Sequence, residues 1–191
     1  MPYSERFDRA FGLAHELHRQ QRRKGGEIPY VTHLMSVAAL VAEYGGTEDQ
    51  AIAGLLHDAV EDQGGLTVLD RIREEFGDAV AAMIDACTDA HELPKPPWEE
   101  RKRAHVDRMK NAPEGALLII AADKIHNLRA MIADYRAVGD ALWGRFKKGR
   151  PDILWYYRAM AAELRGLSSH RIYDELDAMI DAFEQLTSNE Q

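Results

Sequence analysis

The sequence is poor in cysteine: Cys87 is its only thiol among 191 residues. A single thiol cannot form an intrachain disulfide, and it cannot by itself build a thiolate metal site. A lone cysteine is more often a small buried apolar side chain than a reactive one. The cysteine usage therefore excludes a disulfide-stapled scaffold and fits a reducing compartment.

Positive charge and long apolar runs are also scarce. The chain has 24 lysines and arginines against 32 aspartates and glutamates, which gives a formal net charge of −8. It therefore lacks a broad basic surface for a nucleic-acid backbone or an anionic membrane. No apolar stretch is long enough to span a bilayer, and the first residues do not resemble a secretory signal. We expect a cytoplasmic protein that binds neither extended nucleic acid nor a membrane.

The alternation of apolar and polar residues that is typical of β-strands is missing too. Apolar side chains instead recur at helical spacing, as in Phe7, Phe11 and Ala14 and in Val37, Leu40, Val41 and Tyr44. Glycine pairs at 25–26, 45–46 and 64–65 are typical of helix ends. The pattern predicts an all-α fold, a single helical bundle of about eight to nine helices.

The length fits one domain, because 191 residues with 46% hydrophobic content can bury one sizeable core. We expect this domain to span residues 1–191, with the sequence motifs in a core at 7–131 and bracing helices at 137–187. The late aromatic residues are expected to pack in the bracing helices rather than to stack on a nucleotide base: Trp143, Phe146, Trp155, Tyr156 and Tyr157.

Local signals predict particular boundaries. Thr67 is expected to cap a helix near 68–76, and Pro113 is expected to precede a helix near 114–133. The prolines between residues 91 and 97 forbid a continuous helix there. We expect that segment to form a surface loop over the functional site.

Four ionisable side chains interrupt an apolar helical segment at residues 51–62: His57, Asp58, Glu61 and Asp62. At about 100° per residue they share one broad helix face. Burying such a face is costly unless a cation compensates the carboxylates, although the His57-Asp58 doublet alone could be a surface ion pair. His33 and Asp123 could complete a coordination sphere without sulfur, which suits manganese, iron, cobalt or zinc better than calcium.

The motifs together resemble the HD-domain phosphohydrolases, and specifically the branch that hydrolyses (p)ppGpp. The segment at 22–33 is similar to that family's basic, glycine-containing turn before its first histidine, and 55–62 matches the HD-x-x-ED motif. The segment at 122–129 resembles A-D-K/R-x-x-N-x-R. A weaker likeness begins at Thr88-Asp89.

The resemblance implies a ligand set of His33, His57, Asp58 and Asp123, with manganese as the expected cofactor and another divalent transition metal as the alternative. It also implies a small-molecule nucleotide substrate. Glu61 and Asp62 would handle the attacking water in removing the 3′-pyrophosphate of (p)ppGpp, which gives GDP or GTP. Arg23 would meet the base, Lys24 a phosphate and Asn127 the substrate.

Three positions depart from the family pattern: Leu34 follows the first histidine, Ala90 follows Thr-Asp, and Ala130 stands where a polar residue is frequent. These departures leave metal binding intact. They keep open an HD phosphohydrolase acting on an adenosine alarmone, a deoxynucleotide or NADPH. A third hypothesis is a catalytically idle nucleotide-binding or antitoxin-like module, because fold does not fix function.

Several basic side chains have both a functional and a structural interpretation. The cations at 22–24 could simply complement the dipole at a helix end, although their proximity to His33 favours function. Lys124 could bind phosphate or form an ion pair. His126 and the basic patch at 147–150 stay open, as do the oligomeric state and regulation.

Overall fold

The structure is a computed structural model, and it describes residues 3–90 and 95–188. All regular elements within these residues are helices, and the one β-type contact is an isolated bridge between Arg22 and Pro29. The predicted all-α class is confirmed. No helix in the described part of the chain has the length and apolarity that a membrane crossing requires.

The first half of the chain contains six helices: α1 (Glu5–Leu17), α2 (Val31–Glu43), α3 (Glu48–Leu56), α4 (Ala59–Gln63), α5 (Gly65–Phe76) and α6 (Asp78–Cys87). After the gap come α7 (Trp98–Arg108), η1 (Met109–Asn111), α8 (Glu114–Val138), η2 (Gly139–Arg145), α9 (Arg150–Leu167) and α10 (Ile172–Ser188), of which η1 and η2 are 3-10 segments. Residues 91–94 of the predicted surface loop lie outside the described residues.

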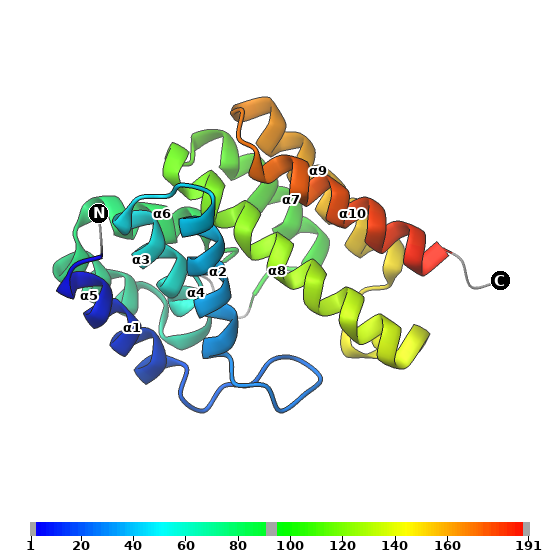
Figure 1. Ribbon diagram of the computed structural model, residues 1–191, viewed down its shortest axis with the longest axis horizontal. Coiled ribbons are helices and arrows are strands. Elements are labelled where there is room, and N and C mark those ends of the chain that lie inside the picture. Colours follow the sequence, from blue (N-terminus) through cyan, green and yellow to red (C-terminus); the bar gives the residue numbers. More distant parts are fainter. Residues whose placement is uncertain (1–2, 91–94, 189–191) are drawn as a thin grey trace.

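Helix α8 is the centre of the bundle. It contacts α2, α3 and α6 from the first half of the chain and α9 and α10 from the second, and Figure 1 shows it running between these two groups. Its buried residues begin at Ala116 and continue through Ile132 to Tyr135. This continued apolar pattern carries the helix to Val138, beyond the predicted end at 133. Gly139, with φ +56°, then ends it.

One predicted helix start is wrong. Thr67 does not cap its helix, because α5 already begins at Gly65. Gly64 ends α4 and also directly precedes α5. The positive φ of Gly65, +59°, lets the chain turn within one residue, so that no separate capping segment is needed.

The helix assumed for the ionisable cluster is interrupted. His57 lies at the end of α3 and Asp58 immediately before α4, so the four side chains do not share one continuous helix. Both residues keep right-handed helical torsions, and the amide of Asp62 still donates to the carbonyl of Asp58 at 3.0 Å. His57 and Asp58 therefore lie at the junction of two helices rather than within one.

The packing of α10 against α8 predicts a stability effect. Phe183 of α10 is fully buried, and its ring packs edge-on against Trp143 of η2. We expect Phe183→Ala to lower the free energy of unfolding by about 3–5 kcal/mol, through lost burial and the cavity left behind. Urea denaturation measures this difference. Phe11→Ala, at a side chain that is 39% exposed, is the matched control and should change stability by about 0.5 kcal/mol or less.

Candidate metal centre and adjoining pocket

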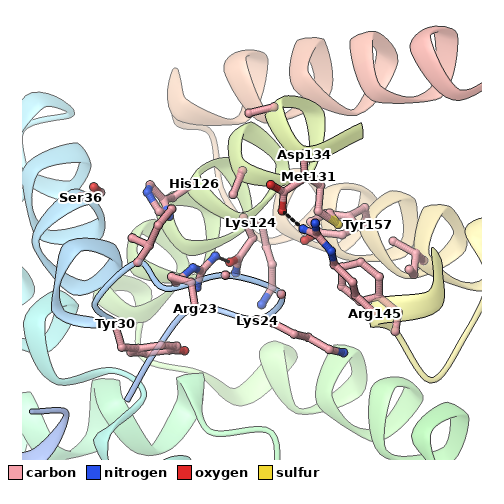
Figure 2. A pocket seen from close by; sticks show the side chains of 18 of the residues that line it. Arg23, Lys24, Tyr30, Ser36, Lys124, His126, Met131, Asp134, Arg145 and Tyr157 are labelled. Atoms are coloured by element: carbon pink, nitrogen blue, oxygen red, sulfur yellow. Dashed lines mark hydrogen bonds and ion pairs between the residues drawn. The ribbon is translucent and has the colours of Figure 1, made fainter. Parts of the chain in front are cut away.

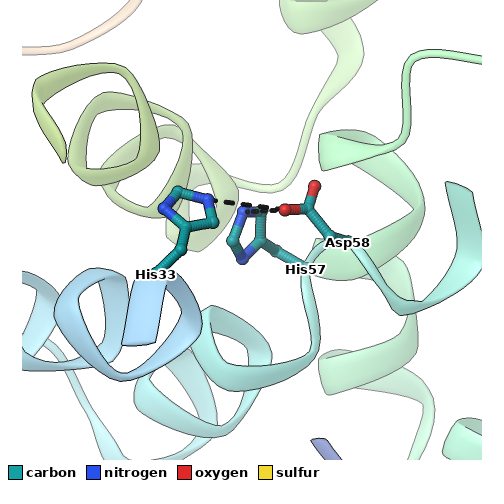
Figure 3. Close-up of side chains that lie close together, drawn as sticks. All are labelled: His33, His57 and Asp58. Atoms are coloured by element: carbon teal, nitrogen blue, oxygen red, sulfur yellow. Dashed lines mark ion pairs between the residues drawn. The ribbon is translucent and has the colours of Figure 1, made fainter. Parts of the chain in front are cut away.

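Three predicted ligands meet where α2 faces the junction of α3 and α4. His33, His57 and Asp58 each offer an atom within 4.8 Å of the others. Asp58 Oδ2 lies 3.1 Å from His57 Nε2 and 3.4 Å from His33 Nε2, as Figure 3 shows. Both histidines are buried, so the cluster is screened from solvent on the imidazole side.

The fourth predicted ligand arrives from α8. Asp123 Oδ1 lies 3.2 Å from His33 Nε2 and 3.7 Å from His57 Nε2. This carboxylate is held from two sides, because Lys124 Nζ donates to Oδ2 at 2.6 Å and Asn127 Nδ2 donates to Oδ1 at 2.5 Å. The contact between α2 and α8 thus brings together residues that are 90 positions apart.

The donor set fits a divalent cation. The Nε2 atoms of His33 and His57 are buried, and neither has a hydrogen-bond partner among the described residues. His57 Nδ1 lies 2.8 Å from the carbonyl of Gly54, which assigns the ring proton to Nδ1 and leaves the lone pair of Nε2 facing the carboxylates. A buried lone pair beside two carboxylates is unfavourable without a positive charge between them.

The electrostatics of the cluster lead to the same conclusion. Burial alone would lower the pKa of His57, but the adjacent carboxylates of Asp58 and Asp123 outweigh it and raise that pKa well above its usual value. Burial would likewise raise the pKa of Asp58, yet His57 and His33 hold it well below its usual range. The two carboxylates therefore favour a positive charge within the cluster. A proton on an imidazole supplies this charge when no metal cation is bound.

Two neighbouring rings support the ligands. Tyr30 donates its hydroxyl to Asp58 Oδ2 at 2.7 Å, and His126 Nδ1 lies 2.7 Å from His33 Nδ1. Burial, with help from His33 and Arg23, lowers the pKa of His126 to about 4. Since neutral His126 can share one proton with His33, it orients the ring of His33 and is not itself part of the ligand cluster.

The two predicted catalytic acids have different partners. Glu61 accepts from Lys95 Nζ at 2.7 Å and from the amide of Asp89 at 3.3 Å. Asp62 accepts from Gln21 Nε2 at 2.8 Å, and burial together with the nearby charge of Asp58 raises its pKa. The two carboxylates are therefore held in distinct environments.

A pocket of about 610 Å³ adjoins the metal cluster and opens between the loop before α2, helix α8 and η2 (Figure 2). Its lining is basic and aromatic: Arg23, Lys24, Lys102, Lys124 and Arg145 with Tyr30, Trp98, Phe146, Tyr156 and Tyr157. A cavity of this size and charge suits a phosphorylated small molecule with an aromatic base.

The predicted substrate-binding residues all line this pocket. Arg23 Nη2 donates to Asn127 Oδ1 at 2.6 Å, and Lys24 Nζ lies 4.5 Å from the ring centre of Phe146. Neither cation ends a helix: α1 stops at Leu17, and the loop is held by the bridge between Arg22 and Pro29. Complementing a helix dipole is therefore not their role.

Sequence reasoning missed part of the lining. Phe146, Tyr156 and Tyr157 were expected to be core residues only, but all three also face the pocket. Asp134 was not singled out at all. Its signal was available, since it follows Asp123 by 11 residues and so returns to the same face of α8.

The chain is similar in sequence to proteins of known family. A family profile described as an HD domain matches residues 10–145. The human guanosine-3′,5′-bis(diphosphate) 3′-pyrophosphohydrolase MESH1 is 41% identical over 123 residues, which are 63% of this chain and 66% of that protein. A GTP pyrophosphokinase of Streptomyces coelicolor is 38% identical over 126 residues, 65% of this chain but only 14% of that protein.

The similarity extends to solved structures. One of them, a metazoan ortholog of SpoT described as hydrolysing ppGpp, superposes with a TM-score of 0.79 and 27% identity. The superposition covers 95% of this chain and 97% of that one. By sequence, however, the matched segment spans just under two thirds of the human MESH1 protein.

The cluster predicts affinity for divalent metal. We expect the protein loaded with Mn²⁺ to retain the ion through desalting, and Asp58→Ala to lose it, because the variant lacks one of the four ligands and one of the two carboxylates that compensate the charge of the ion. Elemental analysis measures the content, and Tm should rise by about 5–10 °C with Mn²⁺ in hundredfold excess over Kd. Asp62→Asn is the control that keeps the ion; equal retention by Asp58→Ala would contradict the site.

Proposed function

Because this chain belongs to the HD-domain family, we propose that it is a manganese-dependent hydrolase that removes the 3′-pyrophosphate of ppGpp or pppGpp. The family predicted from the sequence motifs is thereby confirmed. The observation that carries the proposal is the meeting of two imidazoles and two carboxylates beside a basic, aromatic pocket. The activity for which the MESH1 relatives are named supports the choice of substrate.

In the proposed reaction, water attacks the phosphorus that is bonded to the 3′-oxygen. The bond between this phosphorus and the 3′-oxygen breaks, and the products are pyrophosphate and either GDP or GTP. A divalent cation held by His33, His57, Asp58 and Asp123 would polarise a phosphoryl oxygen and lower the pKa of the attacking water. Glu61, held by Lys95, would accept the proton of that water.

Asp62 suits the complementary task. Burial raises the pKa of this carboxyl, so that it holds a proton more readily than an exposed aspartate. Gln21 fixes one of its oxygens. A carboxyl in this state can deliver a proton to the departing 3′-oxygen, which otherwise leaves as an unstable alkoxide.

The pocket would orient the nucleotide. Arg23 is oriented by Asn127 and lies 5.5 Å from the ring centre of Tyr30, so the face of its guanidinium that is turned away from Tyr30 is available to a base. Lys24, whose pKa is lowered by burial and by the nearby charge of Lys147, would offset phosphate charge at the pocket edge. These placements support the substrate roles that the sequence predicts for Arg23, Lys24 and Asn127.

A second candidate is hydrolysis of another nucleotide by the same centre. Ala130 lines the pocket with a methyl group where a polar side chain would help to select the base. An adenosine alarmone, a deoxynucleotide or NADPH could then compete. A catalytically idle nucleotide-binding module is the less supported reading, because Glu61 and Asp62 are both held by hydrogen bonds beside the metal cluster.

The proposal predicts a substrate-specific assay result. Protein stripped of metal should release no pyrophosphate, and reloading with Mn²⁺ should restore release from ppGpp but not from GTP or NADPH. Assays of released pyrophosphate and of released orthophosphate, run with these three nucleotides and an adenosine alarmone, measure this, because NADPH carries a single 2′-phosphate and cannot yield pyrophosphate. Phosphate release from NADPH, or pyrophosphate release from the adenosine alarmone alone, would keep the centre and change the substrate, whereas no release from any nucleotide would contradict a hydrolase.

Glu61→Gln tests the proton acceptor. The amide keeps the shape of the side chain but cannot accept a proton, so kcat for ppGpp should fall by about 10²–10⁴-fold. Bound metal, measured by elemental analysis, should stay at the wild-type level. Glu99→Gln, at an exposed acid paired with Arg103, is the control that should leave kcat unchanged. Normal turnover by Glu61→Gln would remove Glu61 as the base.

A further inference from the structure

The pocket contains one acidic side chain among the described residues that line it, Asp134. Its other charged neighbours are cations, which attract the phosphates of a nucleotide. A carboxylate among them repels the same phosphates, so its presence calls for a partner that donates hydrogen bonds. The part of a nucleotide that offers such donors is the edge of its base.

Asp134 is paired with Arg145, but both retain hydrogen-bonding capacity. Arg145 Nη1 donates to Asp134 Oδ2 at 2.8 Å, and Figure 2 shows this contact in the pocket wall. The side chain of Asp134 is 44% exposed and that of Arg145 is 25% exposed. A carboxylate accepts about four hydrogen bonds and a guanidinium donates five, so one shared bond leaves acceptors and donors beside each other.

The pair lies at the end of the pocket away from the metal cluster. Asp123, Asn127 and Asp134 occupy one face of α8, and Asp134 stands about 16 Å beyond Asp123 along the helix axis. Between Asn127 and Asp134 the α8 side of the wall is apolar, formed by Ala130, Met131 and Ala133. A nucleotide whose 3′-phosphates lie at the metal cluster would extend its base toward this end.

Arg145 is positioned by the loop opposite. Gly25 has φ +80°, and a Cβ placed there would clash with the side chain of Arg145. The loop can therefore approach Arg145 closely only with glycine at this position. Lys24, which precedes Gly25 in the sequence, places its ammonium over the ring of Phe146, the residue after Arg145. The side chain of Arg145 therefore lies against the loop at Gly25 while its guanidinium donates to Asp134.

We propose that Asp134 and Arg145 read the guanine base of the substrate. The carboxylate would accept from N1–H and the 2-amino group, while the guanidinium would donate to O6 and N7, the acceptors that arginine pairs with in nucleic acids. Adenine offers an unprotonated N1 to the carboxylate and an amino group to the guanidinium, so both contacts become unfavourable. This inference rests on the proposed function, whose substrate it refines.

The test compares the 3′,5′-bis(diphosphates) of guanosine, inosine and adenosine. Wild-type protein loaded with Mn²⁺ should prefer guanosine over adenosine by about 10–100-fold in kcat/KM. Inosine, which keeps N1–H but lacks the 2-amino group, should fall between them. Asp134→Asn should reduce the guanosine preference to threefold or less, mainly through KM. Equilibrium Kd values of metal-free protein, followed by the fluorescence of Trp98 in the pocket wall, should show the same ranking.

Asp140→Asn is the matched control. Asp140 accepts from Trp143 Nε1 at 2.9 Å and from Tyr135, so it anchors the same 3-10 segment without lining the pocket. Its substitution should leave the base preference unchanged. An equal loss of preference in Asp140→Asn would mean that the pair only holds η2 in place, and would overturn the proposal.

Two further outcomes would also overturn it. One is a wild-type protein without a base preference, or an Asp134→Asn variant that keeps the full wild-type preference; the other is tighter binding of all three nucleotides by Asp134→Asn, which would show a purely electrostatic effect on phosphate. Failure of the hydrolase proposal has a separate signature. Guanine-selective binding without pyrophosphate release from any of the three nucleotides would keep the base-reading pair and reject the reaction.

Discussion

The structure depends on the burial of two imidazoles and two carboxylates against one another. His33, His57, Asp58 and Asp123 come from three separate segments, and none has a favourable place in a helical core by itself. Their charges become tolerable because they are concentrated around one point, where a proton or a divalent cation compensates them. The interruption of the helix between α3 and α4 and the contact of α2 with α8 bring these four side chains together.

The surroundings of the cluster show how a buried ionic site is kept in one arrangement. Tyr30 and Asn127 each donate to a ligand carboxylate, while the backbone of Gly54 and the ring of His126 fix the imidazoles. Such outer contacts orient the ligand atoms before any ion binds. Glu61 and Asp62 stay outside this set, each with its own partner, which leaves them available for proton transfer.

Helix α8 links the cluster to the pocket and gives the site its direction. It supplies Asp123 at the metal end, Asn127 one turn later, and Asp134 at the far end, with small or apolar side chains between. A single rigid element therefore sets the spacing between the ligand cluster and the pair that we propose to read the base. The loop before α2 and the segment η2 form the other walls, and their contact through Gly25 and Arg145 fixes the width of the far end.

The sequence by itself determined the helical class, the four candidate ligands and the acid pair, because helical periodicity and the order of motifs are properties of neighbouring residues. It misplaced His57 and Asp58 on one continuous helix, because a change in hydrogen bonding between two residues with helical torsions leaves no mark on composition. Only the tertiary structure decided that Arg145 meets Asp134, that Tyr157 faces a pocket, and that His126 supports His33. These contacts join elements whose relative placement depends on the packing of the whole bundle around α8, and local sequence carries no record of that packing.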